Sequence, residues 1–276
     1  MKWFLIAVSM LISTPAYAGS HAFVYKLSPG QVWKAVSDSQ SRSEFMGRKD
    51  VTRTRNVIEY KVLKGPRPGW VTLSARIVSS SQKTGGPMDP SLMRFQADMH
   101  KSGEIRNIRT SGGDRMSAQM NGQDLPPETA AMFKQSFQFM MDAWKASVFW
   151  FPEFPEQTME PGDEFDMTMK SGMGGCGGAM NMKTVAKQVF TLDEIRDGLA
   201  YFSVRERSLT KASGPGGGKS RTKTAGKGEA IFDLREGMWV EMTTKSRIRV
   251  NLGNLPGMGP GDHEMLNIHK IAMEKE

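Results

Sequence analysis

One glycine-rich segment carries the residues best suited to chemistry. It reads DMTMKSGMGGCGGAMNMK, at residues 166–183, and holds Cys176, the one cysteine of the sequence. Thioether and thiolate groups are soft ligands that select Cu(I). Met173 and Cys176 lie three residues apart, and Met169 or Met180 would complete a trigonal set. One interpretation of this segment is therefore a copper site.

The same segment is also typical of a β-hairpin. EFDMTMK and MNMKTVAKQVF would form two strands around a glycine-rich loop at 171–179. Phe165, Met167 and Met169 would then share the core face of the first strand, where flexible thioethers fill gaps well. Because the chain has 22 methionines, Met-x-Met also arises readily by chance. The hairpin is the favoured interpretation, and the copper site is the alternative.

A second biased segment, KASGPGGGKSRTKTAGKG at residues 211–228, is rich in glycine and cations. Its composition suggests a phosphate-binding P-loop, but Ser213 stands where that pattern needs glycine. A mobile hairpin loop is the favoured interpretation. Lys219, Arg221 and Lys223 would then face water or contact an anionic lipid headgroup or glycan.

The sequence contains no catalytic constellation. It has four histidines, and neither an HExxH metal-binding motif nor a GxSxG nucleophile motif occurs. His263 and His269 are six residues apart, which is not the spacing of a ligand pair on a helix. We therefore predict that the chain is not an enzyme and has no cofactor, except for the copper of the alternative interpretation.

The first residues, MKWFLIAVSMLISTPAYAGS, are typical of a secretory signal peptide. Lys2 precedes an apolar run at 3–12, and a small-x-small signal ends at Ala18. We expect residues 1–18 to be removed near Ala18 and the remainder to be a soluble periplasmic protein without a transmembrane segment. The net charge of +8 favours anionic partners, and nucleic acid is excluded by the compartment. One cysteine cannot form an internal disulfide.

Apolar residues alternate at the period of strands over most of the chain. In WVTLSARIV, at residues 70–78, Val71, Leu73, Ala75 and Ile77 share one face, and polar residues occupy the other. Such alternation is typical of antiparallel strands with one face on the core and one in water. We therefore predict a mainly β protein.

Two halves of the chain repeat the same pattern of turns and strands. A glycine opens a strand that reaches an aromatic residue three positions later, at Trp33 in the first half and Phe165 in the second. Matching turn glycines follow: Gly69 and Gly198 after the second strand, and Gly103 and Gly237 before the last. We predict two similar curved antiparallel sheets or part-barrels, a first β lobe at 19–125 and a second at 162–276.

The segment between the lobes, 126–161, combines one amphipathic helix with a proline-rich hinge. PPETAAMFKQSFQFMMDAWKASVFW starts with Pro127 in the first turn and carries a broad apolar face. This helix is expected either to plug the concave face of the sheet or to cover an apolar cavity as a lid. In the second case a hydrophobic ligand would contact Phe133, Phe137, Met140, Met141 and Trp144.

The hinge motif Phe-Pro-x-x-Pro, followed by a spacer and Pro-Gly-Asp-x-aromatic, occurs in FWFPEFPEQTMEPGDEF at residues 149–165. It resembles the mid-chain hinge of an uncharacterised family of secreted bacterial β-rich proteins with two lobes. The resemblance covers about residues 149–249. It implies an exported protein with two similar lobes, and no activity.

These observations together predict an exported, soluble, non-catalytic envelope protein. It would bind a hydrophobic or amphiphilic small molecule in a concave sheet, because such a sheet offers an apolar interior with a mouth, or act as an assembly module for another envelope protein. The alternative is a periplasmic Cu(I)-binding protein that uses the methionine and cysteine residues of 167–182.

Overall fold

The computed structural model describes residues 19–45, 48–81, 93–111, 141–142, 144–145, 147–173, 181–213, 218–251 and 262–276. The predicted signal peptide at 1–18 lies outside these residues. So do Cys176 and Met180 of the copper interpretation, and Phe133, Phe137 and Met140 of the predicted ligand-binding helix.

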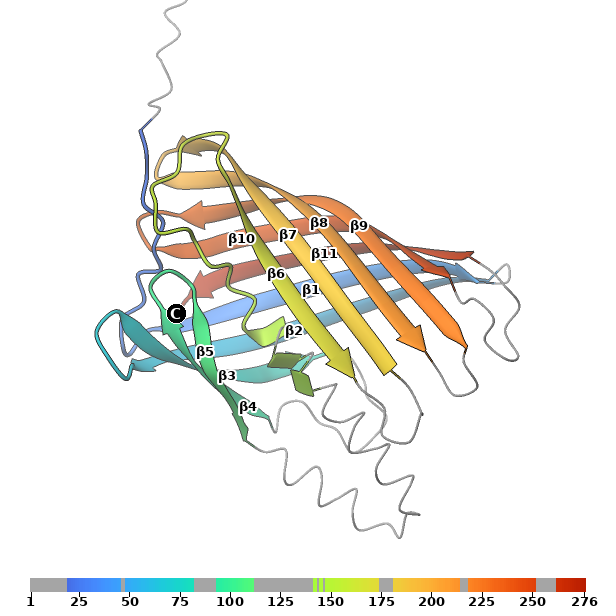
Figure 1. Cartoon of the computed structure of the whole chain (residues 1–276). Helices are drawn as coiled ribbons and strands as arrows, with labels where there is room; N and C mark the ends of the chain where they lie inside the picture. Colours follow the sequence, from blue (N-terminus) through green and yellow to red (C-terminus); the bar gives the residue numbers. More distant parts are fainter. Residues whose placement is uncertain are drawn as a thin grey trace, which may run out of the picture.

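The described part of the chain forms one antiparallel sheet of eleven strands (Figure 1). In chain order the strands are β1 (Val32–Phe45), β2 (Arg48–Lys64), β3 (Trp70–Ser80), β4 (Arg94–His100), β5 (Ile105–Ser111), β6 (Glu164–Met173), β7 (Asn181–Arg196), β8 (Leu199–Ser213), β9 (Lys219–Asp233), β10 (Met238–Asn251) and β11 (Asp262–Lys275).

The order of strands across the sheet is β5-β4-β3-β2-β1-β11-β10-β9-β8-β7-β6. The prediction of a mainly β, antiparallel protein is thus confirmed. The prediction of two separate sheets is wrong, because the first strand pairs with the last. That pairing runs from Trp33 opposite Lys275 to Ser43 opposite Met265 and joins the two predicted lobes into one sheet.

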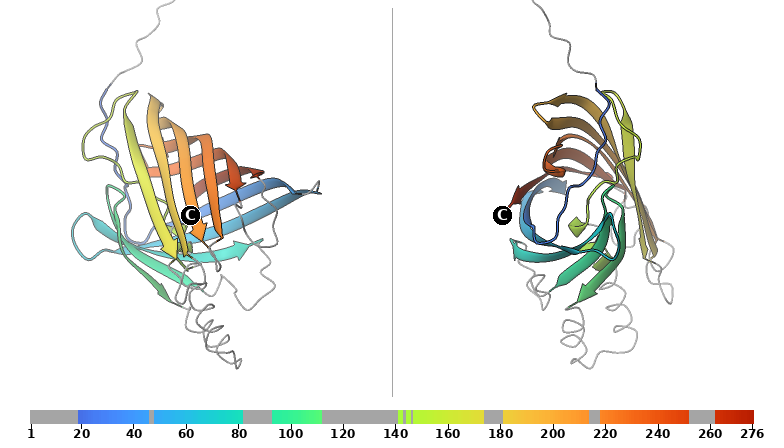
Figure 2. Two further views of the ribbon diagram at one scale, coloured as in Figure 1. Left: turned by 45° about the vertical axis from the view of Figure 1, so that its right-hand side comes forward. Right: turned by 90° about the vertical axis from the view of Figure 1, so that its left-hand side faces the viewer.

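The sheet is curved, with one concave and one convex face (Figure 2). Alternation along the strands assigns side chains to these faces: on β8, Phe202 and Val204 are buried on the concave side, while Ser203 and Arg205 are exposed. The turns of the two halves also match. The N–H of Gly30 donates to the carbonyl of Val62 at 2.8 Å, and that of Gly162 donates to Leu192 at 2.7 Å.

The matched turn glycines adopt backbone angles that side chains oppose. The φ angle is 96° at Gly30 and 100° at Gly162, where each half begins. The later pairs are also positive, at 78° and 82° for Gly69 and Gly198, and 102° and 63° for Gly103 and Gly237. Glycine is the residue that adopts such angles at little cost, which explains why the repeated pattern is marked by glycine.

Two irregular segments, 19–31 and 149–163, fill one end of the concave face (Figure 2). We call these the plug. Its aromatic side chains are buried against rings from both halves of the sheet: Phe154 packs on Phe232 and Trp239, with ring centroids 4.9 and 5.6 Å away. The plug is tied to the β4–β5 turn, because the N–H of Phe154 donates to Ser102 at 2.7 Å.

Three buried hydrogen bonds join the sheet, the two segments of the plug, and Val148, the residue just before the second segment. The Tyr60 hydroxyl donates to the carbonyl of Val148 at 2.6 Å. The Tyr25 hydroxyl donates to the carbonyl of Pro152 at 2.9 Å and accepts from Trp239 Nε1 at 2.7 Å. Burial raises the pKa of both tyrosines, so both hydroxyls keep the proton that they donate.

These extended segments fill the part of the concave face where a helical plug was predicted, and the predicted helix lies largely outside the described residues. Residues 126–140 lie outside the described chain, and its helical backbone is limited to 141–142, 144–145 and 147–148, so no complete helix is described. Pro152 and Pro155 have no N–H to donate to a helix, and each favours an extended conformation of the residue before it. Within the described ranges, no helix is long and apolar enough to cross a membrane.

The contact between the plug and the β4–β5 turn predicts different costs for two glycine substitutions. A Cβ on Gly103 would lie 2.4 Å from the Pro152 carbonyl oxygen, whereas one on Gly30 meets nothing within 4 Å. Both have similar φ angles, so backbone strain should cost each alanine variant about 1–3 kcal/mol. We expect Gly103→Ala to lower the free energy of unfolding by about 2 kcal/mol more than Gly30→Ala, measured by urea denaturation. Equal losses would show that the plug does not press on this turn.

Candidate functional site

The concave face beside the plug contains an open cavity of about 850 Å³. Its wall comes from both halves of the sheet and from the chain just before the plug. The lining residues are Ala35, Ser37, Ser39, Thr54, Asn56 and Ile58 of β1 and β2; Asp142, Trp144, Ser147 and Trp150; Met167, Met169, Lys170, Ser171, Gly172, Thr184, Ala186 and Gln188 of β6 and β7; and Met242, Asn267, His269 and Ile271 of β10 and β11. We call this the concave cavity.

One side of the concave cavity is apolar and aromatic. Trp150 is 7% exposed and stacks on Phe151 of the plug, with ring centroids 5.8 Å apart. Trp144 is half-buried, and both indoles face the cavity together with Met242 and Ile271. A ligand in the cavity would therefore meet two flat aromatic surfaces at the border of the plug.

Another part of the lining is a row of polar side chains on the neighbouring strands β1 and β11. Ser37 Oγ lies 3.0 Å from His269 Nε2. Ser39 and Ser41 both donate to Asn267 Oδ1, at 3.0 and 3.1 Å. The strand pairing dictates these contacts, since β1 and β11 place Ser39 opposite His269 and Ser41 opposite Asn267. These groups form a hydrogen-bonding surface of hydroxyl, amide and imidazole.

A carboxylate lies on the concave face next to this polar row. Glu206 extends over Gly226 and accepts hydrogen bonds from Ser246 and, at 3.4 Å, from Gln188 Nε2. Gly226 leaves room for this contact, because a Cβ there would lie 2.8 Å from Glu206 and Ser246 atoms. The carboxylate is thus held in place across one intervening strand.

Burial lowers the pKa of His269, and the charge of Glu206 partly opposes that shift. The imidazole is therefore neutral at neutral pH, with one ring nitrogen free to accept and one to donate. The neutral ring adds to the hydrogen-bonding capacity of the cavity without adding a charge.

The Ser37–His269 pair has the separation of a nucleophile and its base, which raises the question of catalysis. Acyl transfer also needs N–H groups that point at the developing oxyanion. Ser37 lies in the middle of β1, between β2 and β11, where the backbone N–H groups belong to the strand ladders. The pair is better suited to lining a binding cavity than to attacking a carbonyl.

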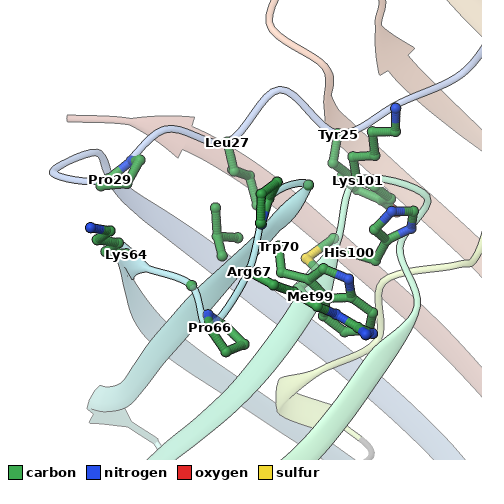
Figure 3. Close-up of a pocket in the computed structure, with 14 residues that line it drawn as sticks. Tyr25, Leu27, Pro29, Lys64, Pro66, Arg67, Trp70, Met99, His100 and Lys101 are labelled. Carbon is green, nitrogen blue, oxygen red and sulfur yellow. The ribbon is translucent and has the colours of Figure 1, made fainter.

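A second cavity, of about 520 Å³, lies where the β2–β3 turn meets the β4–β5 turn (Figure 3). Trp70 is at its centre, with the guanidinium carbon of Arg67 4.6 Å and that of Arg106 5.4 Å from the ring centroid. The His100 ring lies 5.2 Å away, next to Met99 in Figure 3. The basic side chains that line this cavity are those of Lys64, Arg67, His100 and Lys101.

The structure places the predicted ligand-binding residues in different environments. Trp144 lines the concave cavity, whereas Met141 is 4% exposed and belongs to the core. Phe133, Phe137 and Met140 fall outside the described residues, so their predicted role stays a prediction.

The predicted hairpin at the methionine-rich segment is confirmed by the pairing of β6 with β7, in which Met169 lies opposite Ala186 and Met173 opposite Met182. Among the residues that the structure describes, no group of three or more histidine, cysteine or acidic residues could hold a metal ion. Copper binding stays a prediction, because Cys176 and Met180 lie outside those residues.

The predicted mobile loop at 211–228 is largely wrong, because most of it is strand. β8 continues to Ser213, and β9 begins at Lys219 and pairs with it along its whole length. Lys219, Arg221 and Lys223 are exposed on the convex face of β9. These cations alternate with small residues, which is the pattern of a strand. The segment was predicted to be a loop because of its high glycine content.

Sequence reasoning missed the polar row of the concave cavity. A signal was present in VWKAVSDSQSRSEF, where Trp33 and Ala35 are followed by serine at every second position from Ser37 to Ser43. That change, from apolar to hydroxyl on one strand face, marks the border between plug and cavity. Asn267 and His269 could not be found in this way, because their partners are more than 200 residues away in sequence.

No family model matches the chain, and no curated protein is similar to it. The resemblance of the hinge to a secreted two-lobed family therefore stays a prediction.

Several solved structures are similar at low identity. Ail, the attachment invasion locus protein of Yersinia pestis, covers 90% of this chain and 100% of its own at 7% identity, with a TM-score of 0.22. An outer membrane channel of Pseudomonas putida F1 covers 91% and 97% at 8% identity, with a TM-score of 0.19. A BenF-like porin from Pseudomonas fluorescens Pf-5 covers 91% and 100% at 7% identity, with a TM-score of 0.23.

These similarities contradict the location and function that the sequence predicted. We expected a soluble periplasmic envelope protein without a transmembrane segment, whereas the similar structures include an outer membrane channel and a porin. The predicted periplasmic location, the soluble carrier or assembly function, and the hydrophobic-molecule or envelope-protein partners are corrected accordingly and are not retained. At TM-scores of 0.19 to 0.23, the similarity assigns this chain neither a membrane position nor a transported molecule.

The lowered pKa of His269 predicts a pH dependence of stability. As pH falls below the ordinary histidine pKa of 6.5, the unfolded chain binds a proton before the folded chain does. The free energy of unfolding should therefore decrease from about pH 7 to pH 5. We expect His269→Gln to reduce this slope while keeping a polar side chain, as measured by urea denaturation at a series of pH values. An unchanged slope in the variant would contradict the burial of a neutral imidazole.

Proposed function

We propose that the concave cavity binds a small hydroxylated molecule with one apolar face, and that a sugar is the ligand class that fits it best. The observation that carries the proposal is that two indoles and a row of serine, asparagine and histidine side chains line the same cavity. The volume of about 850 Å³ lies in the usual range for small-molecule sites.

The chemistry of the two walls matches the two surfaces of a sugar ring. Its C–H face is apolar and flat enough to lie against Trp144 or Trp150. Its hydroxyls both donate and accept, as do the groups that Ser37, Asn267 and the neutral His269 present. Buried polar groups of this kind discriminate strongly against ligands that leave them unpaired.

The same polar row counts against a purely hydrophobic ligand. An alkyl chain across the cavity would cover Asn267 Nδ2 and His269 Nδ1 without offering either atom a hydrogen bond, at a cost of about 1–3 kcal/mol for each group. The apolar end of the concave face, where such a chain would fit better, is already occupied by the plug.

A sugar panel tests this proposal. Neutral, amino and acidic hexoses and their disaccharides are titrated into the full chain, and tryptophan fluorescence is recorded, because Trp144 and Trp150 line the cavity. We expect at least one sugar to change the emission in a saturable manner. Asn56→Ala combined with Asn267→Ala should lower the affinity for that sugar about tenfold or more, because the two lost hydrogen bonds contribute about 1 kcal/mol each.

The matched control replaces two convex-face amides, Gln40→Ala with Gln96→Ala, and should leave the affinity unchanged. Ala186→Trp offers a second test, because Ala186 lines the cavity and the larger side chain would occupy ligand space. Thermal melts of each variant identify any loss of folding. Absence of binding by every sugar, or binding that is indifferent to both cavity variants, would overturn the proposal.

A further inference from the structure

The convex face of the sheet contains a hollow of about 570 Å³ at the ends of β7, β8, β9 and β10. Four cations line it: Lys183, Lys211, Lys219 and Arg221. The other lining residues are uncharged, being Asn181, Ala212, Ser213, Ser220 and Asn251. We call this the basic hollow. It is separate from the concave cavity and lies on the opposite face of the sheet.

The strand register places like charges directly against one another in this hollow. Lys183 of β7 lies opposite Lys211 of β8, and Lys211 lies opposite Arg221 of β9. Directly opposite residues on antiparallel strands have Cβ atoms about 4.5–5.5 Å apart, and like charges there destabilise the sheet. Three cations in one cross-strand row therefore repel one another unless an anion lies between them.

In this cross-strand row the first acidic residue is Asp262 on β11, which is separated from Arg221 by Asn251. Ion pairs on the same face involve other residues, such as Lys187 with Asp166 and Arg249 with Glu264, and none of the described ion pairs includes a cation of the basic hollow. The neighbouring connections at 174–180, 214–217 and 252–261 contain no aspartate or glutamate in their sequences. Lys183 and Lys211 are further from Asp262 than Arg221 is, so the β7–β8 end of the row carries the excess of positive charge.

We propose that the basic hollow binds a phosphate group that carries at least two negative charges or belongs to a polyphosphate. Lys183, Lys211 and Arg221 would supply the positive charge. Lys219, at the end of β9, would contact the phosphate from one side. Arginine and lysine both suit phosphate oxygens, arginine through its planar fork and lysine as a compact charge. Asn181 and Ser213, which lie opposite each other on β7 and β8, supply neutral hydrogen-bonding groups at the edge.

The shared chemistry is the phosphate group, and its source can be a soluble phosphate or a lipid headgroup. Two arms distinguish these sources. In the first, inorganic phosphate and tripolyphosphate are titrated into the full chain by calorimetry. In the second, the chain is floated with vesicles of phosphatidylcholine alone and with vesicles that contain phosphatidylglycerol.

The test variant combines Lys183→Gln, Lys211→Gln and Arg221→Gln. Its matched control combines Lys61→Gln, Lys245→Gln and Arg94→Gln, which remove the same charge from exposed positions outside the hollow. We expect the wild type and the control to bind at least one of the two probes, and the test variant to bind it tenfold or more weakly. Binding should also weaken as salt is raised.

A melting experiment supplies a readout that does not depend on affinity alone. Tripolyphosphate should raise the Tm of the wild type, because a ligand that binds the folded state stabilises it, and should not raise that of the test variant. Without ligand, the test variant should melt at the same temperature as the wild type or higher, since its like-charge rows are gone. Binding of tripolyphosphate would identify the ligand as a soluble phosphate. Binding of phosphatidylglycerol vesicles alone would identify it as a lipid headgroup. Failure of both probes, or equal loss in test and control variants, would overturn the proposal.

Discussion

β1 and β11 pair along most of their length, from Trp33 and Lys275 to Ser43 and Met265. This contact joins the first and last strands of the described chain and makes one sheet from two halves that resemble each other in their turns. Curvature then brings the aromatic rings of both halves toward a common interior, where Phe232 and Trp239 of one half meet plug residues that also contact Tyr60 of the other. Without the β1–β11 pairing, neither the plug nor the concave cavity would have a second wall.

The concave face is divided into an apolar end and a polar end along the same strands. On β1 the change occurs between Ala35 and Ser37, and on β11 it occurs between Ile271 and His269. Segments 19–31 and 149–163 cover the apolar end, and within the described residues the polar end stays open. The cavity therefore results from incomplete filling of a curved sheet, and the last plug residues, with Trp150 among them, form its aromatic wall.

The convex face differs from the concave face in carrying many charged side chains, because the alternation along each strand places them there. Acidic partners neutralise part of this surface, as at Arg205 with Glu164 and Lys270 with Glu241, but the row from Lys183 to Arg221 has no such partner among the described residues. A sheet gains no stability from unneutralised cations directly opposite one another. The basic hollow is thus a local exception that binding of an anion would explain, and it is independent of what the concave cavity holds.

The sequence by itself determined the local structure. Period-two alternation predicted the strands, the matched glycines predicted the turns, and the pattern around Met167 and Met169 predicted the β6–β7 hairpin, because each depends on neighbours in the chain. Only the tertiary structure decided that the halves share one sheet, that extended aromatic segments fill its interior in place of the predicted helical plug, and that Ser37 meets His269. The β1–β11 pairing and the Ser37–His269 contact join residues more than 200 positions apart, and many partners on a long alternating strand have similar local patterns. Which partner is chosen depends on burying the apolar faces of all strands together, and no single segment carries that information.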